Sequence, residues 1–233
     1  MGKAGASVFT PDGSQATLGF YGSPIGVVVD SAGNLYFTTA QYKTIRKVNR
    51  ATGLVSTLAG TTVEFPFDGG PAKFSNIGNP HGLAIDVNGS IYFTTILTDP
   101  YKASLVEKID TNGIVSIIAG SYKVDPTQVQ RPYGDGSAAK SALLYDANWV
   151  QVDKLGNFYV AEDNYIRVIS VNTPQAPTPQ SRRMPQNTIW NFAGDGIDGY
   201  TNDGGSITSV QLTLFFLVLV KPNCTSLSSL LRY

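Results

Sequence analysis

The sequence predicts an all-β protein in which a four-stranded antiparallel sheet is repeated about three times. The 233 residues include 24 glycines and 13 prolines, a composition that suits short strands joined by tight turns. The apolar segments are rich in β-branched and aromatic residues and show no 3.6-residue period, so almost no helix is expected. One pattern of strands and turns also recurs three times in the same order, which is typical of a repeat architecture.

The first half of each repeat reads as a β-hairpin. An apolar strand leads into an Asp-x-x-Gly turn, and the second strand then carries an aromatic pair or a Tyr-Val pair. Aspartate accepts backbone hydrogen bonds in such a turn, and glycine tolerates the positive φ that the turn requires. We therefore interpret the turn residues as structural. They are Asp30, Gly33, Asp86, Gly89, Asp153 and Gly156.

The second half of each repeat adds two more strands. Third strands are expected at residues 44–49, 105–110 and 165–171, and fourth strands ending in Ala-Gly at 55–60, 115–120 and 189–194. An Asp-Gly element follows each fourth strand, at residues 68–72, 135–139 and 203–207, and a similar fragment at 12–16 precedes the first copy. Four antiparallel strands in sequential order are the signature of β-propeller blades. We expect blades at about residues 24–60, 80–120 and 147–194, within a propeller region that covers residues 1–212.

The repeats resemble those of the NHL family of β-propellers. The first copy carries the family pattern at Pro24, Gly26, Asp30, Gly33, Asn34, Tyr36, Arg46, Lys47, Leu58, Ala59 and Gly60. The third copy departs from it, with Ala147 in place of the proline and Trp149 in place of the glycine. The resemblance implies an incomplete or truncated propeller of the six-bladed type. Since such propellers serve as scaffolds, sensors and sometimes enzymes, it implies a fold more strongly than a function.

The loops between the second and third strands predict where the protein binds. They differ in every copy, whereas the turns between the first and second strands are uniform, and variable loops on a rigid frame are the usual place of recognition. The candidate binding residues on this face are Gln41, Tyr42, Lys43, Tyr101, Lys102, Glu162, Asp163 and Asn164. We predict a non-enzymatic scaffold that binds a protein or a small-molecule ligand through this face.

The alternative is a lactonase-like propeller hydrolase or lyase with a metal on its axis. Its chemistry would need His81, the single histidine, or the carboxylates of Glu162 and Asp163. Without a second histidine there is no triad-like or histidine-rich metal cluster to assemble, and we interpret His81 as a loop residue at the start of a strand. The Asp-x-x-Gly turns also lack the alternating oxygen ligands of a calcium loop. We therefore predict no catalytic residues, no metal ligands and no cofactor.

Composition excludes several classes of partner and site. With 17 basic and 17 acidic side chains the formal net charge is zero, so nucleic-acid binding is not expected. Cys224 is the single cysteine, which excludes an intramolecular disulfide and a cysteine-type zinc site. The longest apolar run, residues 212–220, is about half of a membrane-spanning helix, and the N-terminus has no signal-peptide pattern. The sequence leaves the cellular location open.

The C-terminal residues break the repeat. Residues 213–233 read as a hydrophobic segment followed by a Ser/Leu-rich tail, where a fourth copy of the pattern would begin. We interpret this tail as non-blade sequence, of the kind that truncation, a frameshift or a retained intron produces, with at most one improvised strand. Three blades cannot close a ring, so the open blade edges leave self-association as an alternative.

Overall fold

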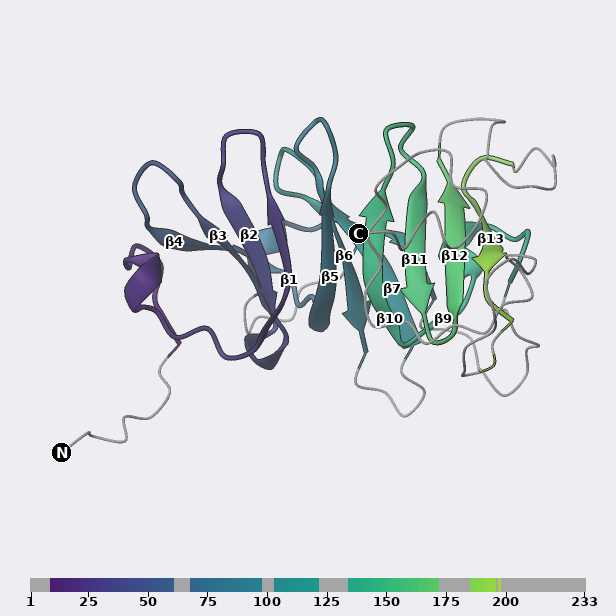
Figure 1. Ribbon diagram of the computed structural model, residues 1–233, viewed down its shortest axis with the longest axis horizontal. Helices are drawn as coiled ribbons and strands as arrows, with labels where there is room; N and C mark the ends of the chain where they lie inside the picture. Colours follow the sequence, from purple (N-terminus) through teal and green to yellow (C-terminus); the bar gives the residue numbers. More distant parts are fainter. Residues whose placement is uncertain are drawn as a thin grey trace, which may run out of the picture.

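The structure is a computed structural model, and it describes residues 9–60, 68–97, 103–121, 134–171, 185–195 and 197. Within these ranges the chain forms three antiparallel sheets that lie side by side, which confirms the predicted all-β fold (Figure 1). The helical segments among the described residues are single 3-10 turns: η1 (Ala16–Leu18), η2 (Ala40–Tyr42), η3 (Ala72–Phe74) and η5 (Ala139–Ser141). None of the helices in the described part of the chain is long and apolar enough to span a membrane.

Each sheet has its strands in sequential order. The first sheet contains β1 (Pro24–Val29), β2 (Leu35–Thr39), β3 (Thr44–Val48) and β4 (Val55–Ala59). The second contains β5 (Asn79–Ile85), β6 (Ile91–Ile96), β7 (Ala103–Ile109) and β8 (Val115–Ala119), and the short β9 (Leu144–Tyr145) pairs with β7. The third contains β10 (Ala147–Val152), β11 (Phe158–Glu162), β12 (Tyr165–Ser170) and β13 (Thr188–Ala193).

The Asp-x-x-Gly turns have the same geometry in all three sheets. In the first, the Asn34 amide donates to Asp30 Oδ1 at 2.8 Å, and the corresponding bonds to Asp86 and Asp153 are both 2.9 Å. The turn glycines, at positions 33, 89 and 156, have φ of 81°, 89° and 85°. Each turn therefore combines an Asx hydrogen bond with a left-handed glycine, as the sequence pattern requires.

Substitution of Gly89 by alanine is expected to reduce the free energy of unfolding by about 1 kcal/mol or more. No atom lies within 4 Å of the position that a Cβ would take, so the loss would come from backbone strain at φ 89°. Urea denaturation of the full chain measures it. Val87→Ala, an exposed side chain in the same turn, is the matched control and should leave the midpoint nearly unchanged. Equal midpoints for both variants would contradict the turn assignment.

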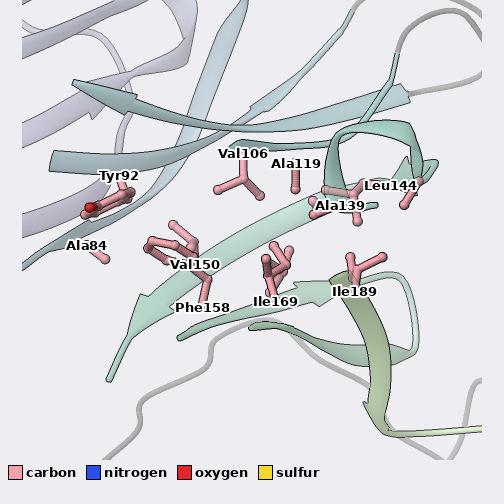
Figure 2. Packing of buried hydrophobic residues seen from close by; sticks show 13 residues of the cluster. Ala84, Tyr92, Val106, Ala119, Ala139, Leu144, Val150, Phe158, Ile169 and Ile189 are labelled. Atoms are coloured by element: carbon pink, nitrogen blue, oxygen red, sulfur yellow. The ribbon is translucent and has the colours of Figure 1, made fainter. Parts of the chain in front are cut away.

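Two hydrophobic cores lie between neighbouring sheets. Between the first and second sheets, Tyr36 and Ile45 are buried in one cluster with Leu83 and Phe93. Between the second and third sheets, a second cluster includes the Tyr92 and Phe158 rings, whose centroids are 4.6 Å apart (Figure 2). Alternate residues of a strand face opposite sides of a sheet, so the second sheet contributes one face to each core.

The first strands of the three sheets contact one another, with β5 between β1 and β10. Close approach depends on glycine at one inner-strand position. A Cβ at Gly26 would clash with the carbonyl oxygen of His81, and a Cβ at Gly82 would lie 2.7 Å from Trp149 Cα. Thr38 adds a polar link, since its hydroxyl donates to the His81 carbonyl at 2.7 Å and accepts from the Gly26 amide at 2.8 Å.

The Asp-Gly elements pair with the sheet that follows them. Their bridges to the fourth strand join Gln15 to Leu54, Pro71 to Ile114 and Ala138 to Thr188. Although the elements at residues 68–72 and 135–139 come after a fourth strand in the sequence, each element hydrogen-bonds to the outer strand of the sheet that follows it and covers part of that edge. The element at residues 203–207 and the tail at 213–233 lie outside the described residues, so the expectations for them remain predictions.

Candidate functional site

Two polar side chains from neighbouring sheets meet where the inner strands begin. His81 in β5 and Asn148 in β10 hold the same place in their repeats, one residue before the position of Gly82 and Trp149. His81 Nδ1 and Asn148 Oδ1 are 3.1 Å apart. Because the sheets are antiparallel, the start of each inner strand and the loop between the second and third strands share one end of the sheet. The pair therefore lies on the face that the variable loops indicate.

The surroundings of His81 favour an uncharged imidazole. Burial lowers the pKa of His81 below its usual 6.5, although the hydrogen bond from Asn148 and the negative charge of Asp146 act in the opposite direction. The Asn148 side-chain nitrogen donates to the Asp146 carbonyl at 2.9 Å, so its amide oxygen faces His81 and accepts. That arrangement puts the imidazole proton on Nδ1 and leaves a lone pair on Nε2.

The row of equivalent inner-strand positions is chemically mixed. Ile25 occupies the place of His81 and Asn148 in the first sheet, and 37% of its surface is exposed. The row can therefore offer apolar contact, an imidazole and an amide to one ligand. In the described part of the chain, no three His, Cys, Asp or Glu residues gather as a metal site would require. Aligning the repeats at their inner strands identifies this row in the sequence. The prediction of a loop position for His81 is wrong, because His81 lies within β5 and is partly buried.

The predicted loop of the first sheet lies beside this row. Gln41 and Tyr42 belong to η2, which contacts β5, and Lys43 follows in a left-handed conformation with φ of 53°. Gln41 and Lys43 are exposed, while Tyr42 is half-buried and its ring packs edge-on against Phe9 at 5.1 Å. In the second sheet, the predicted residues Tyr101 and Lys102 lie outside the described residues.

The third sheet corrects one expectation. Glu162, predicted as a binding residue of the loop between the second and third strands, ends β11 with a side chain only 5% exposed. Its Oε1 accepts from Arg167 Nη1 at 2.7 Å, and its Oε2 accepts from the Tyr145 amide at 2.9 Å. Glu162 therefore belongs to the interior and not to a recognition surface. Asp163 and Asn164 follow as a tight, partly buried turn in which Asp163 has φ of 45°.

The aspartates of the Asp-Gly elements neutralise buried arginines. Arg46 Nη2 lies 3.2 Å from Asp12 Oδ1, and Arg167 Nη2 lies 2.7 Å from Asp135 Oδ1. Both arginine side chains are fully buried, so each needs a nearby carboxylate. The Asp-Gly motif therefore has a structural use in the first and third sheets, in addition to covering the outer strand.

The curated relatives match only part of this chain. No family model matches it. Teneurin-1 of Gallus gallus is 32% identical over 142 residues, which are 54% of this chain and 5% of that protein. Protein SUPPRESSOR OF QUENCHING 1, chloroplastic, of Arabidopsis thaliana is 34% identical over 89 residues, 38% of this chain and 8% of that protein. The chain thus spans less than a tenth of the length of these relatives.

Among solved structures the likeness concerns the propeller fold alone. A streptogramin B lyase is 17% identical with a TM-score of 0.38, the match covering 63% of this chain and 37% of that one. An auxiliary nutrient binding protein of Bacteroides thetaiotaomicron is 16% identical with a TM-score of 0.48, covering 80% and 40%. A gluconolactonase of Xanthomonas campestris is 13% identical with a TM-score of 0.35, covering 71% and 62%. This chain is a set of propeller-like antiparallel sheets similar to parts of these proteins.

Proposed function

We propose that this chain is part of a non-enzymatic, NHL-type β-propeller scaffold that binds a protein or small-molecule ligand. The binding face is the end of the sheets where the inner strands begin. The observation that supports this proposal best is the contact between His81 and Asn148, because it brings hydrogen-bonding groups from two sheets together. Gln41 and Lys43 extend the same face with exposed polar groups.

The rigid frame around the pair suits binding. Backbone atoms of neighbouring inner strands touch at Gly26 and Gly82, so the relative positions of Ile25, His81 and Asn148 are set before a ligand arrives. A preorganised site loses little side-chain entropy on binding, which favours affinity. The similarity to stretches of the teneurins is compatible with repeats of the NHL type.

Substitution of Asn148 by alanine is the direct test of this face. A panel of peptides and small molecules is screened against the full chain by thermal shift, and the affinity of each hit is then measured by calorimetry. We expect Asn148→Ala to weaken binding of face-directed ligands about ten-fold or more, since one lost hydrogen bond to a partly buried group contributes about 1.4 kcal/mol. Lys154→Ala, in the turn at the opposite end of the third sheet, is the control. Hits that lose affinity with Lys154→Ala and keep it with Asn148→Ala would reverse the assignment of the face.

A second function is favoured by one specific observation, the partial burial of His81 beside the Asn148 amide oxygen, which favours a neutral imidazole with its lone pair on Nε2. A general base needs that form at neutral pH, so a lactonase-like or lyase-like activity is the competing proposal. Turnover of lactones and esters by the full chain, with and without added divalent metal, separates the two. We expect no turnover that depends on His81, and activity abolished by His81→Ala would favour the enzyme.

A further inference from the structure

The second sheet carries an acid where its two neighbours carry a base. Arg46, Glu107 and Arg167 occupy the same position on the third strand of their sheets, in register with Phe37, Phe93 and Val160 of the second strands. All three residues are completely buried. The arginines meet the carboxylates of Asp12 and Asp135, as described above. Glu107 instead feels the like charge of Asp68, the aspartate of its own Asp-Gly element.

The hydrogen bonds around Glu107 differ between its neutral acid and its carboxylate. Thr95 Oγ1 lies 2.6 Å from Glu107 Oε2 and 3.0 Å from the carbonyl oxygen of Ile77. A hydroxyl has one proton and a carbonyl oxygen can only accept, so a hydroxyl that donates to Ile77 must accept from a protonated carboxyl group. Among the described residues, Glu107 Oε1 is buried without a hydrogen-bond partner. The neutral acid lets the Thr95 hydroxyl bond to both groups, whereas the carboxylate would place a negative charge in the interior.

The lysines of the surrounding elements contact groups other than Glu107. Lys140 Nζ lies 3.6 Å from Asp68 Oδ2, on the exposed side of that carboxylate. Lys73 in η3 lies 3.7 Å from Asp12, and Lys108 of β7 sits over the Tyr92 ring, 5.6 Å from its centroid, on the opposite face of the sheet. Of the charged groups on these elements, Asp68 is the one that acts on Glu107, and its charge opposes ionisation.

We propose that Glu107 is a proton-controlled latch between the first and second sheets, which holds the start of β5 through Thr95 and Ile77. Ile77 belongs to the core between these two sheets and precedes His81 by four residues. When Glu107 loses its proton, the Thr95 hydroxyl turns toward the carboxylate and the Ile77 carbonyl loses its donor. The consequence for ligand binding at His81 rests on the function proposed above; the latch itself does not.

The direction of the pH dependence follows from the burial of Glu107. Burial raises the pKa of Glu107 from 4.5 to about 8; the hydrogen bond that Thr95 donates to the carboxylate form lowers it, and the Asp68 charge raises it. A pKa that is higher in the folded state means that the stabilisation is complete below pH 4.5 and is lost as the pH rises through 8.

Hydrogen exchange of the backbone amides at residues 77–85, followed in the full chain from pH 5 to pH 9 and corrected for intrinsic rates, tests the latch. If opening of this segment releases the proton of Glu107, its opening equilibrium should rise about ten-fold per pH unit until the pH passes the raised pKa. Glu107→Gln should abolish this pH dependence, because the glutamine amide donates to Thr95 at every pH. Exchange that is independent of pH in the unmodified chain, or equally dependent in Glu107→Gln, would overturn the proposal.

Two further measurements distinguish the proposed latch from other roles of Glu107, such as a cation ligand. Thr95→Val removes the hydroxyl that joins the carboxyl group to Ile77, so it should increase exchange at residues 77–85 already at pH 5. Calcium chloride at pH 8 probes a cation site in place of a protonated acid. A calcium-induced rise in the melting temperature that Glu107→Gln abolishes would contradict the latch. None of these measurements uses a ligand, so failure of the latch and failure of the proposed binding face remain distinguishable.

Discussion

Substitution of Gly82 by alanine is expected to loosen the contact between the second and third sheets and to reduce the free energy of unfolding by about 3 kcal/mol. The added Cβ would lie 2.7 Å from Trp149 Cα and 2.9 Å from the Asn148 carbonyl oxygen. Both are backbone atoms, which cannot rotate out of the way as a flexible side chain can. The inner strand of the third sheet must therefore shift, and the core between the two sheets opens with it.

Urea denaturation compared with Gly89→Ala isolates this effect. Gly89→Ala adds the same methyl group, but no neighbour lies within 4 Å of the added carbon. The stability that Gly89→Ala loses therefore comes from backbone strain alone. Gly82→Ala should lose clearly more stability than Gly89→Ala, and the fluorescence of Trp149 should change in the folded state. Equal losses for the two variants would show that the inner strands do not make the close contact described above.

Substitution of Arg167 by methionine is expected to cost about 3–5 kcal/mol, the range for breaking a buried ion pair by removing one partner. Methionine keeps most of the apolar stem but removes the guanidinium that lies 2.7 Å from the buried Glu162 Oε1. Loss of the cation destabilises the Asp135 carboxylate less, because about a third of the Asp135 side chain is in contact with solvent. Denaturation at neutral pH measures the loss.

Arg46→Met is the matched control for this variant. The partner of Arg46, Asp12, is 38% exposed and can be hydrated after the cation is removed, so the loss of stability should be smaller. Adding Glu162→Gln to Arg167→Met should restore part of the stability, because it removes the buried negative charge that Arg167 offset. If the double variant were less stable than Arg167→Met alone, the buried charge of Glu162 would not be the cause of the lost stability.

The features that could be predicted from the sequence are local ones. The Asx hydrogen bond of Asp30 and the positive φ of Gly33 both lie within one turn, so the residue types alone indicate them. The strand order can also be predicted, because in each of the three repeats consecutive strands pair as antiparallel hairpins. These are short-range properties, in which a residue needs only its near neighbours in the chain.

The features that could not be predicted depend on which sheets become neighbours. Glu162 reads as part of a polar turn, and its burial depends on Arg167 from the next strand and on Tyr145 from the segment before the sheet. The contact between His81 and Asn148 joins residues of two repeats, and it depends on how closely glycine lets the inner strands approach. No periodicity within one repeat contains that information.

The inner-strand glycines also make the packing between neighbouring sheets asymmetric. Gly26 and Gly82 each leave room for the backbone of the following sheet, and the residue at that position in the third sheet is Trp149. The next residue along each inner strand faces the other way: Leu83 and Val150 are 1% and 0% exposed beneath the preceding sheet, whereas their counterpart Val27 is 55% exposed. One face of an inner strand therefore sets how near the following sheet can come, and the other face supplies an apolar side chain to the core.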